Sequence, residues 1–187
     1  MALLVGLAFP LGLYITKVMN GERIPGVSKV LTPCENLIYK VMRVKADEQM
    51  GWKKYLLSVV LFNLFGFLLL FLLCLCQGFL PFNPQHIEGN SWHLAFNTAS
   101  SFMTNTNWQA YSGENALSYF TQFMGLTVQN FVSAATGIAV LFAFIRGLIK
   151  VKSQGLGSFW VDLTKIILYI LLPICLVMTV LLVSQGV

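Results

Sequence analysis

The chain has 187 residues, of which 57% are hydrophobic and only 10% charged. Soluble globular domains carry about 25% charged residues, so this chain has too few charges to cover a water-facing surface. This composition excludes a soluble enzyme, a disordered tail and a secreted disulfide-rich domain. The net charge of +5 does not indicate a nucleic-acid partner, because in so apolar a chain the placement of the charges matters more than their sum.

Four stretches of the chain lack charge: residues 1–16, 55–87, 115–145 and 166–187. Since about 20 apolar residues cross a bilayer core as a helix, each stretch predicts one transmembrane helix. The first stretch is short, but it has no basic segment and no cleavage site typical of a secretory signal. We therefore predict an initial transmembrane helix over residues 1–19. In the fourth stretch, Pro173 is expected to kink the helix.

The basic residues predict the orientation of the chain. Regions rich in Lys and Arg lie on the cytoplasmic side of a membrane, and residues 77–118 contain neither. We therefore expect a multi-pass membrane protein with its N-terminus and the 77–118 segment outside. The 12 basic residues form two groups, which are Lys17, Arg23, Lys29, Lys40, Arg43, Lys45, Lys53 and Lys54, and then Arg146, Lys150, Lys152 and Lys165.

The cytoplasmic segment, residues 20–54, contains a predicted helix. Thr32 can cap its start, Pro33 suits the first helical position and Glu35 can complete a capping box. Apolar residues then gather on one face, which predicts a helix lying on the inner membrane surface. Its functional interpretation is contact with anionic lipid, and the interpretation we favour is a simple connector that rests on the membrane. The apolar residues are Leu37, Ile38, Val41 and Met42.

The external segment contains a second short helix, predicted over residues 92–103. Asn90 or Ser91 can cap it, and it contains no Pro, Gly or charge. Its length of about 18 Å is too short to cross a bilayer, and its composition is too apolar for water. We therefore predict a re-entrant helix that enters the membrane from outside and stops part way.

A polar segment, residues 104–109, follows this helix and predicts a cation filter. Non-helical backbone at membrane depth survives only when it is packed in protein or lines a wet cavity. Its carbonyls can replace hydration oxygens, and the end of the preceding helix favours a cation. No Asp or Glu lies between Asn90 and Ser112, and neutral oxygens suit a monovalent ion better than a divalent one. A solvated surface loop is the alternative.

The third helix, predicted over residues 117–146, carries polar side chains. Gln122, Gln129 and Ser133 are spaced by seven and four residues and share one face of a regular helix, and Asn130 lies close to that face. Buried polar residues in a spanning helix normally face a bundle interior or a water-filled path. We interpret this face as pore-lining, with hydrogen-bonded helix packing as the alternative.

Other chemistry receives little support from the sequence. Cys74 and Cys76 point to different sides of a helix, and a metal site at His86, Glu88 and His93 is a weak alternative. The sequence has no nucleophile–base arrangement and no Gly-rich phosphate loop. We therefore expect no catalytic residues, no organic cofactor and no metal other than a transported monovalent cation.

Several segments resemble one family closely. They are FNPQHIEGNSWHLAFNTASSFMTNTNWQAYSGE and LSYFTQFMGLTVQNFVSAATGIAVLFAFIRG, with GWKKYLLSVVLFN upstream and FWVDLTKI downstream. The chain from about Lys29 onward is similar to the potassium-binding, translocating A subunit of bacterial Kdp potassium-transporting ATPases. That family has an initial helix and four channel-like repeats around a pore. The resemblance implies the bacterial inner membrane, a P-type ATPase subunit that hydrolyses ATP, and two small or accessory subunits as partners.

The resemblance also assigns parts of this chain. It makes residues 55–150 the first channel-like repeat and 157–187 the truncated first helix of the second. The implied potassium filter consists of Thr104, Asn105, Thr106, Asn107, Trp108 and Gln109. The predicted fold class is therefore all-α integral membrane, with four transmembrane helices, one re-entrant pore half-helix and a filter loop.

The chain departs from the family pattern in its length. It holds one full repeat and lacks the other three filter strands, and one repeat cannot close a pore around an ion. We therefore expect an incomplete subunit. The predicted function is to bind extracytoplasmic potassium and pass it across the membrane within an ATP-driven uptake complex. A non-conducting structural or interaction subunit of a membrane is the alternative.

Overall fold

The computed structural model describes residues 1–22, 24–149 and 155–186, which are helical or irregular and contain no strand. Four residues named above lie outside the described residues. They are the basic residues Arg23, Lys150 and Lys152, and Val187 at the end of the predicted 157–187 segment. The chain forms two compact units. Unit 1 comprises Met1–Trp52 and Ala139–Val187, and unit 2 comprises Lys53–Ile138.

Three helical runs are long and apolar enough to cross a membrane: Trp52–Phe79, Thr121–Ile149 and Phe159–Ser184. They bear out an all-helical membrane protein. The first predicted span forms helix α1 (Ala2–Met19), and its stretch Val5–Met19 is apolar but shorter than the other three runs. By length and composition, three of the four predicted spans are therefore supported within the described part of the chain.

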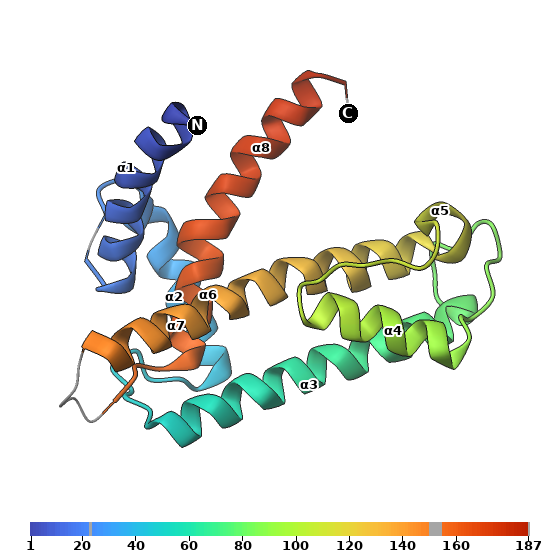
Figure 1. Cartoon of the computed structure of the whole chain (residues 1–187), viewed down its shortest axis with the longest axis horizontal. Helices are drawn as coiled ribbons and strands as arrows, with labels where there is room; N and C mark the ends of the chain where they lie inside the picture. The colour runs from blue at the N-terminus through green and yellow to red at the C-terminus, as the bar shows by residue number, and fades with distance from the viewer. Residues whose placement is uncertain (23, 150–154, 187) are drawn as a thin grey trace. The chain divides into compact units, whose positions relative to one another are not determined.

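Unit 2 is built around the packing of α3 (Trp52–Cys76) against α4 (Trp92–Met103). Figure 1 shows α4 beside α3, with the segment after α4 running back along α6 toward the short helix α5 (Gly113–Ala116). The buried face of α4 is made of small residues and one large aromatic, which allows close approach of the helices. The core cluster of this unit comprises Leu70, Cys74, Ala95, Ala99, Phe102, Leu117 and Leu126.

The third long helix begins at Tyr119 and ends at Ile149, so the predicted bounds of 117 and 146 were too early at both ends. Ser118 caps the start, because its Oγ accepts the Thr121 N–H at 3.2 Å. The helix opens with the π-helical segment η2 (Thr121–Thr127) before α6 (Val128–Ile149). Within η2 the Thr127 hydroxyl donates to the Gln122 carbonyl, five residues back, at 3.0 Å.

Unit 1 contains α1, α2 (Val27–Met42), residues 139–149 of α6, and the run of α7 (Phe159–Lys165), η3 (Ile166–Leu171) and α8 (Leu172–Ser184). Helix α2 begins at Val27, so the predicted start at Thr32 was wrong. Gly26, with φ +82°, precedes the helix, a backbone conformation that glycine adopts readily. Pro33 consequently lies inside the helix rather than at its start.

Glu35 explains why the capping-box prediction failed. Its carboxylate accepts hydrogen bonds from Tyr39 Oη and Tyr169 Oη, each at 2.7 Å, instead of turning back to a helix start. Burial, followed by the neighbouring Glu35 carboxylate, raises the pKa of Tyr39. Glu35, which was predicted to complete a helix cap, therefore links α2 to the segment η3.

Pro173 lies at the start of α8, directly after the π-helical segment η3. A proline has no N–H to give to the carbonyl four residues earlier, which here belongs to Tyr169. That carbonyl instead accepts the Tyr14 hydroxyl at 2.6 Å. A side chain of α1 therefore supplies this carbonyl with a hydrogen-bond donor.

Candidate ion-binding site

Helix α4 sets the position of the predicted filter segment. Ser91 caps its start, with its Oγ accepting the Leu94 N–H at 3.4 Å. At its end the chain turns back, because the N–H groups of Thr106 and Asn107 both donate to the Ser101 carbonyl, at 3.0 and 3.2 Å. The filter segment therefore begins against the last turn of α4. The Ser101 carbonyl, in the last turn of α4, is therefore occupied by these two N–H groups.

The two filter threonines bind to each other and to the helix end. Thr104 Oγ1 lies 3.0 Å from the Ser100 carbonyl and 3.2 Å from the Ser101 carbonyl. It also lies 2.9 Å from Thr106 Oγ1. These side-chain contacts add to the backbone hydrogen bonds that the Ser100 and Ser101 carbonyls already accept.

The two filter asparagines connect the segment to α6. Asn105 and Asn107 have positive φ, at +57° and +56°, a conformation that asparagine tolerates better than most residues. Asn107 Nδ2 donates to Asn130 Oδ1 at 2.9 Å and to Asn105 Oδ1 at 3.3 Å. Ser133 Oγ donates to the same Asn105 oxygen at 3.2 Å. The structure thus brings four predicted site residues into one cluster of neutral amides and a hydroxyl.

The other predicted site residues lie elsewhere. Gln109 and Trp108 are exposed. Gln122 Nε2 donates to the carbonyls of Gly113 and Leu117, at 3.1 and 2.9 Å. Gln129 is buried against Gly66 of α3, where an added Cβ would stand 2.6 Å from its Oε1.

The π-helical segment explains this division of the predicted pore-lining face. A π-helix closes its hydrogen bonds over five residues instead of four, so it turns less per residue than an α-helix. Gln122 lies within η2, so regular spacing does not hold between it and the residues of α6, such as Asn130 and Ser133. Asn130 and Ser133 reach the filter asparagines, whereas Gln122 binds the loop backbone.

Gln77 is a residue that sequence analysis missed. It is fully buried, and its amide nitrogen donates to the carbonyls of Glu88 and Ala116 and to Asn90 Oδ1, at 2.8, 2.9 and 3.2 Å. Its amide oxygen accepts the Ser118 N–H at 3.1 Å. A glutamine at the end of an apolar run is typical of a helix boundary. No local signal in the sequence therefore indicated that Gln77 binds distant backbone groups.

The electrostatics of the site come from uncharged groups. Asn107 Oδ1 is buried without a hydrogen-bond partner, and such orphaned acceptors are rare in proteins. The nearest acidic residue along the chain after the filter is Glu114, whose Oε2 accepts the Ser112 hydroxyl at 2.5 Å. That hydrogen bond lowers the pKa of Glu114. Among the residues that the structure describes, no three His, Cys, Asp or Glu side chains gather as a metal site.

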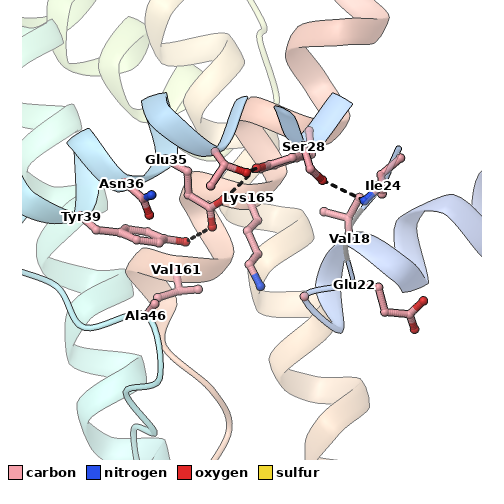
Figure 2. A pocket seen from close by; sticks show the side chains of 13 residues that line it. Val18, Glu22, Ile24, Ser28, Glu35, Asn36, Tyr39, Ala46, Val161 and Lys165 are labelled. Carbon is pink, nitrogen blue, oxygen red and sulfur yellow. Dashed lines mark hydrogen bonds between the residues drawn. The ribbon is translucent and has the colours of Figure 1, made fainter. Parts of the chain in front are cut away.

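Unit 1 holds a second polar region of different character. A cavity of about 260 Å³ is lined by residues of α2 and α7 and of the loop after α1 (Figure 2), among them Glu22, Glu35 and Lys165. Nearby, Arg146 and Asp162 form a two-pronged ion pair with distances of 2.6 and 2.9 Å. Unit 1 therefore concentrates charged groups, whereas the cluster in unit 2 has none.

Comparison with known proteins identifies the family. A family model described as "KdpA: Potassium-transporting ATPase A subunit" matches residues 1–187. The potassium-transporting ATPase potassium-binding subunit of Clostridium botulinum (strain Eklund 17B / Type B) is 62% identical over 185 residues, covering 99% of this chain and 32% of the relative. The subunit of the same name from Desulfovibrio desulfuricans is 54% identical over 187 residues, covering 100% of this chain and 32% of that protein.

A third relative of that name, from Pseudomonas entomophila, is 58% identical over 177 residues, covering 95% of this chain and 31% of the relative. The fold defines an all-helical membrane protein with a neutral polar cluster beside one of its long helices. The chain belongs to the potassium-transporting ATPase A subunit family, and it spans about a third of the length of these relatives.

Proposed function

We propose that this chain supplies the first of four filter segments that bind extracytoplasmic potassium in an ATP-driven uptake complex. The observation that carries the proposal is the cluster of Asn105, Asn107, Asn130 and Ser133, which joins residues 104–109 to α6 through neutral groups. A solvated loop would not require such ties to a long apolar helix. We infer that the ion is potassium because the relatives are named potassium-binding subunits.

The proposed arrangement in the membrane follows the charge pattern and the helix lengths. Helix α1 is the first of four spans, and the N-terminus lies outside the bacterial inner membrane. Helix α4 enters from the outside as a re-entrant half-helix, which is consistent with its length of 12 residues and its apolar composition. Helix α2 lies on the cytoplasmic surface, where its exposed Val30, Leu37 and Val41 contact lipid.

The chemistry of the filter follows from its backbone and its lack of charge. Carbonyls alternate in direction along an ordinary extended chain, and a positive φ at Asn105 and Asn107, but not at Thr106, favours turning successive carbonyls toward one side. Carbonyls on one side can replace the hydration shell of potassium. The orphaned Asn107 Oδ1 adds one more neutral acceptor. A divalent ion, which prefers carboxylates, gains less from these ligands.

The rest of the transport cycle belongs to other chains. The remaining filter segments come from further repeats of the same subunit, and ATP hydrolysis comes from a P-type ATPase subunit. Two small or accessory subunits complete the complex. In this division of labour the present chain is not an enzyme but part of the ion path.

Cysteine accessibility tests the proposal directly. In the full-length subunit, the native cysteines (Cys34, Cys74, Cys76 and Cys175 in this chain) are replaced and a single cysteine is introduced by Thr106→Cys. The matched control is Gln85→Cys, at an exposed external position away from the filter. We measure labelling from outside by a small cationic thiol reagent and by a bulky maleimide, with and without potassium.

The expected result is that Cys at position 106 reacts with the small reagent but slowly with the bulky one, and that potassium slows the reaction more than sodium does. Position 85 should react with both reagents regardless of the ion. Equal labelling of the two positions by the bulky reagent, unaffected by potassium, would show a surface loop and would favour a non-conducting structural subunit.

A further inference from the structure

Asn105 and Asn107 both have positive φ, at +57° and +56°, a region that asparagine adopts more readily than most L-residues. The end of α4 accounts for Asn105, because the Thr106 N–H donates to the Ser101 carbonyl and the Asn105 N–H to the Phe102 carbonyl, as in helices that end in a left-handed residue. These backbone hydrogen bonds leave the side chains of both asparagines to be oriented by other contacts.

The side chains of α6 meet both asparagines. Ser133 Oγ donates to Asn105 Oδ1 at 3.2 Å, and Asn130 Oδ1 accepts from Asn107 Nδ2 at 2.9 Å. The two asparagines are joined to each other at 3.3 Å, and Ser133 Oγ also lies 3.1 Å from the Asn130 carbonyl. The four residues form a closed ring of contacts, with two members on the filter and two on one turn of α6.

This ring decides which oxygens remain for an ion. The side-chain oxygens of Asn105 and Asn130 are already acceptors within the ring, whereas Asn107 Oδ1 is buried without a partner. Since an amide has two ends, the donation by Asn107 Nδ2 to Asn130 Oδ1 fixes the side chain and leaves Asn107 Oδ1 outside the ring. The acceptor on α6 thus orients the free oxygen on the filter.

We infer that Asn130 and Ser133 are positioning residues that hold the side chains of the filter asparagines in place and orient Asn107 Oδ1, and that they do not coordinate the ion themselves. This inference rests on the proposed function. It assigns the two residues a role different from the pore-lining role that spacing alone predicts. Their effect on potassium passes through Asn105 and Asn107.

The experiment uses the full-length subunit assembled with its ATPase partner. The variants are Ser133→Ala, Asn130→Leu and the double variant, and the readouts are the half-saturating concentrations of potassium and sodium and the maximal ATPase rate. The control on the same helix is Thr136→Val. Thr136 is buried, as Ser133 is, but its hydroxyl donates to the Val132 carbonyl of its own helix at 3.0 Å.

Loss of one ring contact should raise the half-saturating potassium concentration about fivefold and reduce discrimination against sodium, with the maximal rate retained. The double variant should resemble the stronger single variant, because breaking the ring once releases both asparagines. Thr136→Val should leave the potassium response unchanged. Loss of assembly in both single variants, with Thr136→Val intact, would mean a purely structural role and would overturn the inference.

Asn107→Ala separates this inference from the proposed function. If Asn107→Ala weakens potassium binding while Ser133→Ala and Asn130→Leu leave it unchanged, the positioning role is wrong and the filter assignment stands. If all of these variants, including Asn107→Ala, leave the potassium response unchanged, the filter assignment itself is wrong.

Discussion

The two units of this chain stabilise their polar groups by different means. In unit 1 the polar contacts involve formal charges, in the ion pair of Arg146 and Asp162 and in the carboxylate of Glu35 held by two tyrosines. In unit 2 the cluster around Asn105 and Asn107 is made of amides and hydroxyls only. Both units belong to a chain with 10% charged residues, so the placement of these charges is informative.

Under the proposed function, the difference has a physical basis, because unit 2 would bind an ion and unit 1 would not. A fixed carboxylate near a filter binds cations strongly but slows their release, whereas conduction requires binding weak enough for the ion to leave. Neutral oxygens let the ion itself supply the charge. Buried ion pairs, by contrast, are strongly destabilised when one partner is lost. Substitutions of the polar groups in unit 1 should therefore mainly lower its stability. Substitutions in the polar cluster of unit 2 should mainly change the response to the ion.

The largest effect is expected at the ion pair of unit 1. Asp162 is almost completely buried, with its side chain 4% exposed, and it binds Arg146 through both carboxylate oxygens. Asp162→Ala leaves the guanidinium without its partner and should lower the free energy of unfolding by about 3–5 kcal/mol. The midpoint of thermal unfolding in detergent measures this change.

A double replacement provides the control for the ion pair. Arg146→Met together with Asp162→Leu removes both charges, and such replacements are often neutral or stabilising. The double variant should therefore unfold at a higher temperature than Asp162→Ala. A double variant no more stable than the single one would mean that Asp162 acts through contacts other than Arg146.

The next effect is expected at Gln77 in unit 2, an uncharged side chain whose hydrogen bonds hold the surrounding backbone in place. Gln77→Leu keeps the volume but leaves the carbonyls of Glu88 and Ala116 and the Ser118 N–H without their partner. Each unsatisfied buried group costs about 1–3 kcal/mol, so we expect a loss of about 3 kcal/mol. Thermal unfolding and protease cleavage within residues 78–91 measure it.

Gln85→Leu is the matched control, because Gln85 lies in the same loop and is exposed. It should change neither the unfolding midpoint nor the cleavage rate. If Gln77→Leu also leaves both unchanged, the loop is held by its other contacts, such as the Asn90 N–H to the Cys74 carbonyl at 3.0 Å.

These examples show what the sequence could predict. The long helices follow from local composition alone, because an apolar, charge-free run needs no knowledge of its partners. Helix α4 also has the bounds expected from sequence, since Ser91 caps it and polar residues follow it; its re-entrant placement stays a prediction. The roles of Glu35 and Gln77 depend on residues distant in the sequence. Tyr169, for example, is 134 positions from Glu35.

The face of the third helix was difficult to predict for a different reason. Spacing by seven and four assumes a regular α-helix, and the segment η2 is π-helical. The hydrogen bond of Thr127 to the carbonyl five residues back accompanies this change, but single threonines are common in helices that remain regular. The prediction consequently assigned Gln122 to the same face as Ser133. In the structure, Gln122 forms its hydrogen bonds with other residues.

A smaller effect is expected at the carbonyl of Tyr169 in unit 1, four residues before Pro173. Tyr14→Phe removes the hydroxyl that this carbonyl accepts at 2.6 Å and should cost about 1 kcal/mol. Pro173→Ala supplies a backbone N–H that can take the same carbonyl. Tyr14→Phe should therefore cost less in the Pro173→Ala background, and a double-mutant cycle of unfolding free energies measures the coupling.

The double-mutant cycle needs a control variant that loses a tyrosine hydroxyl at another position in the chain. Tyr119→Phe serves, because Tyr119 is 58% exposed, and its cost should be near zero in both backgrounds. Additive costs for Tyr14→Phe and Pro173→Ala would mean that the tyrosine does not replace the missing N–H.

The smallest effect is expected at Glu114, the one carboxylate that follows the filter segment closely in the sequence. The Ser112 hydroxyl lowers the pKa of Glu114, so the carboxylate remains charged at neutral and mildly acidic pH. Its charge is lost only as the pH falls through that lowered value. Because the group is exposed, it acts as a distant attraction on cations, screened within about 10 Å at 0.1 M salt.

Glu114→Gln should therefore reduce the apparent association rate of potassium by about twofold or less at low ionic strength, and by nothing measurable at high ionic strength. Rapid-mixing uptake by the full-length complex at the two salt concentrations measures the change, with Glu88→Gln as the control on the same external segment. A salt-independent loss of affinity in Glu114→Gln would instead place this carboxylate in contact with the ion. The contrast between a charged unit 1 and a neutral ion site in unit 2 would then be wrong.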